Sequence, residues 1–232
     1  YWSKKQKQGI KKLNLKWVIK LNEISTYEMI SNENWAPTPL LKANIISDHF
    51  NSEIWLKRED CTPVKSFKLR GALSVLSDLV NQGSKINKIV AASAGNYGLA
   101  IAEACKRNNI PCVIYVPENA NKSKVERIKL TGSEVVKIGS DFDDAKLHGK
   151  KYAEDTGDIF LEDGDLDGMH IGAGTIGTEI INSGIDFDYI FVPIGNGSLI
   201  SGIGKAFKDS KSKAQIIGLI PSASPCMYLA LN

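Results

Sequence analysis

Ser66-Phe67-Lys68-Leu69-Arg70-Gly71-Ala72 is the stretch of this 232-residue sequence that decides the fold. The stretch Ile54-Trp55-Leu56-Lys57 precedes it and predicts a strand, and Ser66 is suited to cap a helix that starts next. The helix is indicated by apolar residues that recur every three or four positions, at Leu69, Leu73, Leu76 and Val80. Gly83 is expected to end it. The pattern therefore places Lys68 at the beginning of a helix that follows a strand.

From residue 53 onward, strand and helix patterns alternate along the sequence. Strands are predicted at 88–93, 112–116, 134–138, 159–161, 189–194 and 215–220. Helices are predicted between them at 95–108, 121–131, 142–155, 174–182 and 199–207. This order is typical of parallel βαβ units, so the fold class is α/β, and the block 87–164 reads as one compact doubly wound unit.

Two further glycine-bearing turns lie at strand-to-helix junctions. They are Ser93-Ala94-Gly95-Asn96-Tyr97-Gly98 and Gly195-Asn196-Gly197-Ser198-Leu199. The first N–H groups of a helix are unpaired and carry partial positive charge, so each turn can bind an anion. Taken alone, the first turn could be an ordinary βα connection, and the second could be a tight turn or the start of a dinucleotide fingerprint.

Without its neighbours in the motif, Lys68 would be interpreted as an ordinary solvated lysine at the start of a helix. In a sheltered site, however, its amine could react with an aldehyde, because burial makes the neutral form of a lysine available. A reactive lysine, one cradle for a phosphate and another for a carboxylate are what a pyridoxal-phosphate (PLP) enzyme acting on amino acids needs.

The order and wording of the three motifs resemble the fold type II family of PLP-dependent enzymes, and within it threonine/serine dehydratases and serine racemases. Thr38-Pro39-Leu40 and Gly172-Ala173-Gly174-Thr175 also resemble family stretches, so the resemblance covers about residues 36–230. It implies a tryptophan synthase beta-like fold of two open parallel-sheet domains, the smaller (87–164) inserted in the larger (1–86 and 165–232). Family members run longer, so the larger domain is expected to be incomplete and truncated at the C-terminus.

The resemblance also implies roles for individual residues. Lys68 would carry PLP and remove the α-proton of the substrate. The other cofactor-binding residues would be Phe67, Asn96, Gly195, Asn196, Gly197, Ser198 and Leu199. The substrate would be bound by Ser93, Ala94, Asn96 and Tyr97. The implied reaction is β-elimination of L-threonine or L-serine to a 2-oxo acid and ammonia.

Several departures from the family pattern refine this expectation. Racemases of the family have serine at the position of Ala94, and alanine cannot move a proton, so dehydration is favoured. Tyr97 replaces the usual histidine, which predicts a different rim of the substrate pocket. Relatives with a divalent-cation site have an acid at the position of Ile220, so no metal site is predicted. Asn196 and Ser198 replace two glycines of the phosphate turn, and Ser198 could add a hydroxyl contact.

Two alternatives remain at this stage. The first is β- or γ-replacement, as in threonine synthase or cysteine synthase. Leu69 and the 93–96 turn count against it, whereas Ile220 and the altered phosphate turn count for it. The second is a truncated, non-catalytic protein or a plain nucleotide-binding α/β module.

The composition of the chain limits the kinds of partner that we expect it to bind. A net charge of +3 suggests neither a nucleic-acid nor a membrane partner, and 43% hydrophobic residues are enough for a core. No apolar run reaches the roughly 18 residues that cross a bilayer. The four cysteines show no CxxC spacing and predict reduced thiols and a cytoplasmic protein. We expect a small amino-acid substrate and a homo-oligomer at full length.

Overall fold

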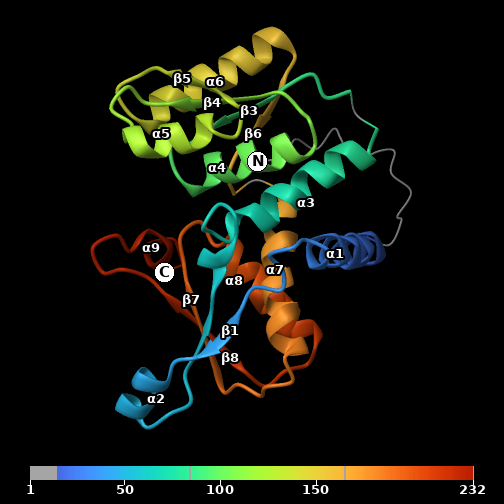
Figure 1. Ribbon diagram of the computed structural model, residues 1–232, viewed down its shortest axis with the longest axis vertical. Coiled ribbons are helices and arrows are strands. Elements are labelled where there is room, and N and C mark those ends of the chain that lie inside the picture. Colours follow the sequence, from blue (N-terminus) through green and yellow to red (C-terminus); the bar gives the residue numbers. More distant parts are fainter. Residues whose placement is uncertain (1–14, 84, 165, 232) are drawn as a thin grey trace.

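A four-stranded parallel sheet forms the centre of one half of the protein (Figure 1). The computed structural model describes residues 15–83, 85–164 and 166–231. The strands are β3 (Ile89–Ala92), β4 (Cys112–Val116), β5 (Glu134–Lys137) and β6 (Ile159–Leu161), in the order β5-β4-β3-β6. The chain moves outward from β3 to β5 and then returns to the other side of β3. The carboxyl ends of β3 and β6 are therefore a topological switch point, where α/β proteins bind ligands.

Helices cover both faces of this sheet, which explains its continuous apolar strands. Alternate residues such as Ile89 and Ile114 face α4 (Asn96–Arg107) and α5 (Lys122–Lys129) in the first core cluster. The intervening residues, such as Val90 and Tyr115, face α6 (Phe142–Thr156) in the second cluster. The strands predicted within 87–164 are confirmed, and the predicted helix ends differ by one or two residues.

The other half of the described chain contains two separate strand pairs. β7 (Tyr189–Pro193) and β8 (Gln215–Leu219) are parallel, as expected. β2 (Trp55–Lys57) instead pairs antiparallel with β1 (Leu40–Lys42), so the expectation of parallel pairing from residue 53 onward is wrong for this strand. Its partner lies upstream of the alternating pattern and has only three residues, too few to show a period in the sequence.

Helix α3 (Lys68–Asn81) lies between the two halves and packs against both α4 and α7 (Asp167–Asn182) (Figure 1). Helix α7 begins seven residues before the predicted start at Gly174. Its early glycines weaken the helical signal, but they allow close contact. A Cβ atom on Gly172 would lie 2.3 Å from the carbonyl oxygen of Arg70. Packing, rather than local propensity, explains this part of the helix.

The remaining helices frame the second half. Helix α8 (Ser198–Asp209) packs on α7, and α1 (Leu15–Ser31) also contacts α7. Two short helices are α2 (Asn44–Phe50) and α9 (Cys226–Leu231), and a 3-10 turn, η2, spans Glu59–Cys61. The sequence did not predict α1, α2, α9 or β1. No helix in the described part of the chain is long and apolar enough to cross a membrane.

The predicted domain division is consistent with the sheets, although one of the core clusters crosses its boundaries. The four-stranded sheet lies entirely within 87–164. The first core cluster, however, joins that sheet to α3 residues such as Leu69 and Leu76 and to Met169 of α7. The boundaries at 86 and 165 therefore stay a prediction.

Candidate active site

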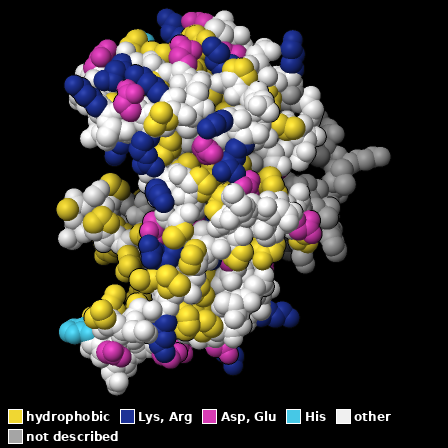
Figure 2. Space-filling view, viewed as in Figure 1, with side chains coloured by type: hydrophobic (Ala, Val, Ile, Leu, Met, Phe, Trp, Pro, Cys, Tyr) yellow, Lys and Arg dark blue, Asp and Glu magenta, His cyan; other side chains and the backbone are white. Residues whose placement is uncertain are grey.

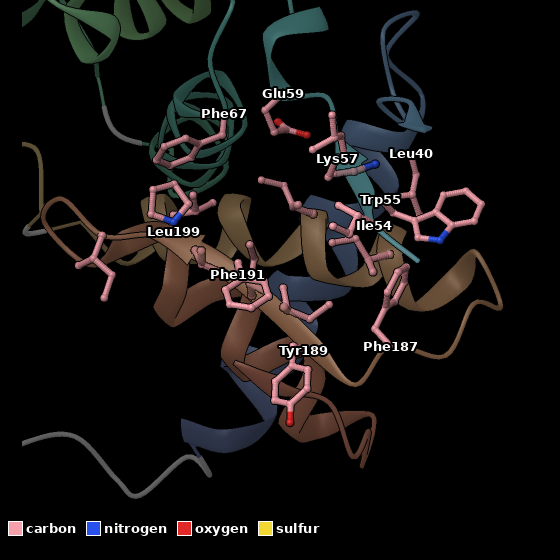
Figure 3. A pocket seen from close by; sticks show the side chains of 18 of the residues that line it. Leu40, Ile54, Trp55, Lys57, Glu59, Phe67, Phe187, Tyr189, Phe191 and Leu199 are labelled. Atoms are coloured by element: carbon pink, nitrogen blue, oxygen red, sulfur yellow. The ribbon is translucent and has the colours of Figure 1, made fainter. Parts of the chain in front are cut away.

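A cavity of about 1470 Å³ opens beside β2 and β7. Figure 3 shows Phe67 and Leu199 at one end of it, and Trp55 and Phe187 at the other. Its walls are mainly apolar, and Figure 2 shows hydrophobic side chains gathered in the half of the molecule that holds α2, β1, β2 and β7. Lys68, Asp163 and the turn 195–197 also line this cavity. Charged groups and a helix start thus meet at an apolar surface, which is typical of a small-molecule site.

Lys68 is the first residue of α3, as the sequence predicts. The cap residue is Phe67 rather than Ser66, but the Ser66 hydroxyl accepts a hydrogen bond from the Lys68 N–H at 3.3 Å. The Lys68 side chain is only 12% exposed. Its Nζ lies 5.3 Å from the centroid of the Phe67 ring and 6.0 Å from that of Tyr97. The amine is therefore sheltered but can be reached from the cavity.

Asp163 is the polar partner of Lys68, and the sequence analysis did not identify it. The Lys68 ammonium donates to both carboxylate oxygens of Asp163, at 2.8 and 2.9 Å. The amide nitrogen of Asn196 donates to Oδ1 of the same carboxylate at 2.9 Å. Asp163 follows β6 and so stands at the switch point of the sheet. Its position after a predicted strand was the available signal, since ligand sites gather at such ends.

The turn 195–199 joins β7 to α8, as predicted. Gly197 adopts a φ of 90°, which residues with a Cβ rarely adopt, and α8 begins at Ser198. Within the described residues, no acceptor is bonded to the N–H groups of Gly195, Asn196, Gly197 and Leu199. These donors and the positive end of the α8 dipole provide an anion site.

The two replacements in this turn have a structural role. The Asn196 side-chain oxygen accepts from the Ser198 N–H at 3.2 Å and from the Ser198 hydroxyl at 2.9 Å. Ser198 is fully buried. Its hydroxyl is therefore used within the turn, rather than being directed at a ligand as the sequence suggested. The Asn196 side chain therefore joins the turn to Ser198 through its oxygen and to Asp163 through its nitrogen.

The turn 93–98 lies at the end of β3, beside the strand that precedes Asp163. The Ser93 hydroxyl accepts from the Gly95 N–H at 3.0 Å, and Asn96, the first residue of α4, is exposed. Ser93 and Ala94 are half-buried. No hydrogen bond or ion pair among the described residues joins this turn to Lys68. Its proposed contact with substrate therefore stays a prediction.

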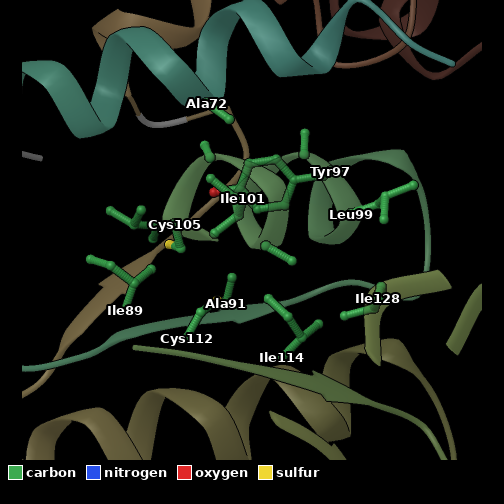
Figure 4. Close-up of a cluster of buried hydrophobic side chains, with 14 of the residues drawn as sticks. Ala72, Ile89, Ala91, Tyr97, Leu99, Ile101, Cys105, Cys112, Ile114 and Ile128 are labelled. Carbon is green, nitrogen blue, oxygen red and sulfur yellow. The ribbon is translucent and has the colours of Figure 1, made fainter. Parts of the chain in front are cut away.

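Tyr97 has a different environment from the pocket rim that the sequence suggested. It is 5% exposed, and its ring lies among the side chains of the first core cluster (Figure 4). Its hydroxyl has no hydrogen-bond partner in the described part of the chain. Burial, together with the charges of Asp163 and Glu162, raises the pKa of this hydroxyl, so it stays protonated. Only the ring of Tyr97 approaches Lys68, and a role in substrate binding stays a prediction.

A buried ionic network surrounds Arg70, two residues after Lys68 in α3. The Arg70 guanidinium is completely buried and donates to two carboxylates: to Glu59 at 2.9 Å, and to Glu179 at 2.6 and 2.9 Å. It also donates to the hydroxyls of Thr38 and Thr175. The stretches 38–40 and 172–175, which carried part of the family resemblance, therefore meet at this arginine.

A model of the family described as "Pyridoxal-phosphate dependent enzyme" matches residues 32–232. The chain belongs to this family. The match includes the turn 93–98, the turn 195–199 and the stretch around Lys68. It decides against a plain nucleotide-binding module, and it confirms both the α/β fold and the family inferred from the sequence.

Relatives and solved structures agree with this family assignment. The chain is 36% identical over 199 residues to biosynthetic L-threonine dehydratase of Halalkalibacterium halodurans, covering 84% of this chain and 48% of that protein. It is 35% identical to the enzyme of Corynebacterium glutamicum, covering 93% and 51%. The processed form of threonine deaminase isoform 2 from Solanum lycopersicum superposes with a TM-score of 0.84 at 32% identity, covering 93% and 58%. The chain thus spans about half the length of the curated relatives it matches.

The residues present fit PLP. A sheltered lysine amine and a set of free backbone N–H groups open into one cavity, and Gly197 adopts the φ of 90° that gives the turn its shape. Lys68 would hold the aldehyde end of the cofactor, and the turn 195–199 its phosphate. In the described ranges, no group of three or more His, Cys, Asp or Glu side chains could hold a metal ion.

Proposed function

We propose that the full-length protein is an ammonia-lyase that uses PLP to eliminate the β-hydroxyl of L-threonine or L-serine, yielding a 2-oxo acid and ammonia. The observation that carries the proposal is the meeting of Lys68 and the phosphate-type turn 195–199 at one end of an apolar cavity. The threonine dehydratases to which the chain is 35% and 36% identical support this reaction over others of the family.

The chain's own residues supply positioning and proton transfer. PLP, when bound, supplies an aldehyde for the substrate amino group and a ring that accepts electrons as a bond to Cα breaks. The N–H groups of 195–199 fix its phosphate. Once the substrate amino group has replaced Lys68 at the cofactor, Nζ of Lys68 is the base that removes the α-proton. The turn 93–97 is the proposed site for the substrate carboxylate, which would be bound by backbone N–H groups at the start of α4.

Racemisation is disfavoured because Ala94 carries no titratable group. β- or γ-replacement is the second candidate of the same family. Leu69, which counted against replacement in the sequence, is completely buried in the first core cluster, so it bears on packing rather than on substrate. The choice between elimination and replacement therefore depends on the relatives and on assay.

Borohydride trapping tests the cofactor assignment. Reduction of the PLP-loaded full-length protein, followed by peptide mass mapping, should place the label on Lys68. Lys57 is the internal comparison, because it lines the same cavity but is already bonded to Glu179 at 2.5 Å. A label on Lys57 or on any other lysine contradicts the assignment.

Assays with L-threonine and L-serine test the reaction. We expect release of 2-oxo acid and ammonia, with little D-serine. Predominant D-serine would contradict elimination, and so would product that forms only when a second nucleophile is added. The variant Ala94→Ser provides a sharper comparison, because a new hydroxyl at this position should raise the small amount of racemised product.

The partners and location follow from the same proposal. The substrate is a small amino acid, and we propose a homo-oligomer for the full-length protein. We also propose a cytoplasmic location, supported by four free cysteines, of which Cys105 and Cys112 are buried. Size-exclusion chromatography with light scattering checks the oligomer.

A further inference from the structure

Asn196 lies in the turn 195–199, and its side chain takes part in three hydrogen bonds. Its Oδ1 accepts from the Ser198 N–H at 3.2 Å and from the Ser198 hydroxyl at 2.9 Å. Its Nδ2 donates to Oδ1 of Asp163 at 2.9 Å. Because a backbone N–H only donates and a carboxylate only accepts, these partners fix which end of the amide is the oxygen. One side chain therefore joins the turn to itself and to the loop that follows β6.

The backbone of this turn does not require asparagine at position 196. The residue with a positive φ is Gly197, at 90°, whereas Asn196 is not among the non-glycine residues with a positive φ in the described part of the chain. Other residues with a Cβ atom could adopt the same conformation. The bonds made by the side chain are therefore what asparagine adds at this position.

The N–H groups of the turn fall into two classes. Those without an acceptor in the described ranges belong to residues that line the cavity, namely Gly195, Asn196, Gly197 and Leu199. Ser198 does not line the cavity and is fully buried, and its N–H is the one that Asn196 accepts. Asn196 thus satisfies the buried donor and leaves the donors that face the cavity free for an anion.

We propose that Asn196 is a positioning residue that holds the turn 195–199 in the conformation that binds the phosphate of PLP. This inference rests on the proposed function for the identity of the anion. A side-chain oxygen that accepts from the N–H two residues further on forms an Asx-turn, which restricts the backbone between them. The residue between them is Gly197, and glycine has the most backbone freedom to lose. A turn that is already ordered loses less conformational entropy when the phosphate binds.

The bond to Asp163 connects this turn to the four-stranded sheet. Asp163 comes two residues after the end of β6, and a Cβ atom on Gly164 would lie 3.7 Å from Nδ2 of Asn196. The two segments are therefore in contact. Asn196 is exposed, so a bond at its second end helps to keep the amide from turning into solvent. The amide is thus held between the start of α8 and a loop attached to a strand.

The test compares PLP with pyridoxal, which lacks the phosphate. Absorbance titration of the full-length apoprotein gives the dissociation constant of each, and their ratio reports what the phosphate adds to binding. In Asn196→Ala we expect PLP to bind about tenfold more weakly and pyridoxal with unchanged affinity. General damage to the fold would weaken both ligands. An unchanged ratio in the folded variant would overturn the proposal.

Two further substitutions at this position keep the test decisive. Asn196→Leu has a similar shape without hydrogen-bonding groups, and it replaces the alanine variant if that protein does not fold, as judged by circular dichroism. It should lower the ratio as alanine does. Asn196→Ser retains an oxygen that can accept from the N–H two residues further on, although more weakly. Its ratio should lie between those of the wild type and the alanine variant, and a ratio as low as that of alanine would contradict the Asx-turn.

Ser198→Ala separates positioning from direct contact with phosphate. It removes a hydroxyl that bonds Asn196 and does not line the cavity. If Asn196 acts by holding the turn, this variant should lower the ratio by about threefold and have little further effect in the Asn196→Ala background. If Asn196 only contacts the phosphate itself, Ser198→Ala should leave the ratio unchanged, and that result would overturn the positioning role.

Asn182→Ala is the matched control. This asparagine on α7 is also exposed, does not line the cavity and donates to the Tyr27 hydroxyl at 2.9 Å, so its loss should not change the ratio. Borohydride trapping separates the two proposals. A label on Lys68 with the same ratio in every variant contradicts only the role of Asn196. A label on another lysine contradicts the proposed function, whereas the ratio still reports on the anion site.

Discussion

Lys68 and Arg70 are two cations on the first turn of the same helix, and their surroundings are opposite. Two residues are about 200° apart around a helix axis, so one side chain faces the cavity and the other faces the core. Arg70 is completely buried, with two carboxylates and two hydroxyls as partners. Lys68 is 12% exposed and, among the described residues, its carboxylate partner is Asp163, which lies on a loop. A fully bonded cation is fixed in place, whereas a cation with one partner can be released for chemistry.

The largest expected effect comes from removing Arg70. Arg70→Met would leave Glu59 and the buried Glu179 without their main partner, since among the described residues only Lys57 and Thr38 would still donate hydrogen bonds to Glu179. Uncompensated buried charge costs about 3–5 kcal/mol. Urea unfolding of the full-length protein should show this loss. The control is Arg58→Met, an exposed ion pair with Asp60, which should change stability by less than about 1 kcal/mol. Equal effects of the two variants would contradict the structural role of the network.

The close contact behind Arg70 predicts a smaller loss. In Gly172→Ala the new methyl group would lie 2.3 Å from the backbone oxygen of Arg70, so α3 and α7 must separate. Overpacking of this kind costs about 1–3 kcal/mol. The control is Gly204→Ala in α8, where nothing lies within 4 Å of the added Cβ atom. That variant should be neutral or slightly stabilising, because alanine favours a helix. Thermal unfolding of both variants provides the measurement.

On the Lys68 side, the turn 195–199 should affect the cofactor more than stability. Gly197→Ala forces a Cβ onto a residue with a φ of 90°, which strains the turn by about 1–2 kcal/mol. We expect PLP affinity to fall by about tenfold. Gly204→Ala in α8 is the control, because its Cβ would meet nothing within 4 Å and Gly204 does not line the cavity. Equal PLP affinity of the two variants in an absorbance titration would mean that the phosphate lies elsewhere.

The smallest expected effect is a pH dependence of stability caused by Glu179, a partner of Arg70. Burial acts to raise the pKa of Glu179, but its hydrogen bonds and ion pairs with Arg70 and Lys57 outweigh burial and leave that pKa below its ordinary value of 4.5. A carboxyl with a lowered pKa in the folded state contributes stability above pH 4.5. That stability is lost as the pH falls through the folded-state pKa. Urea midpoints between pH 7 and pH 3 should therefore fall more steeply in the wild type than in Arg70→Met.

Much of the candidate site could be predicted because its parts are local. Lys68 at a helix start and Gly197 at a positive φ are determined by residues next to them in the chain. Asp163 was missed because its partner Lys68 is 95 residues away, and no local pattern reports such a contact. Tyr97 was placed at a pocket rim for the same reason. Its neighbours in sequence show a helix start, but the packing of α3 over α4 buries it.

Local sequence patterns were enough to predict the alternating α/β order, the family, the position of Lys68 and the two glycine-bearing turns at strand-to-helix junctions, because helix periodicity, turn glycines and motif wording are properties of adjacent residues. The folded structure was needed to show that β1 and β2 pair antiparallel, that Arg70 is buried between Glu59 and Glu179, and that Asp163 bonds both Lys68 and Asn196. These features depend on which strand ends and helix faces meet in space. That choice is made by the burial of apolar surface over the whole chain, which no single segment encodes.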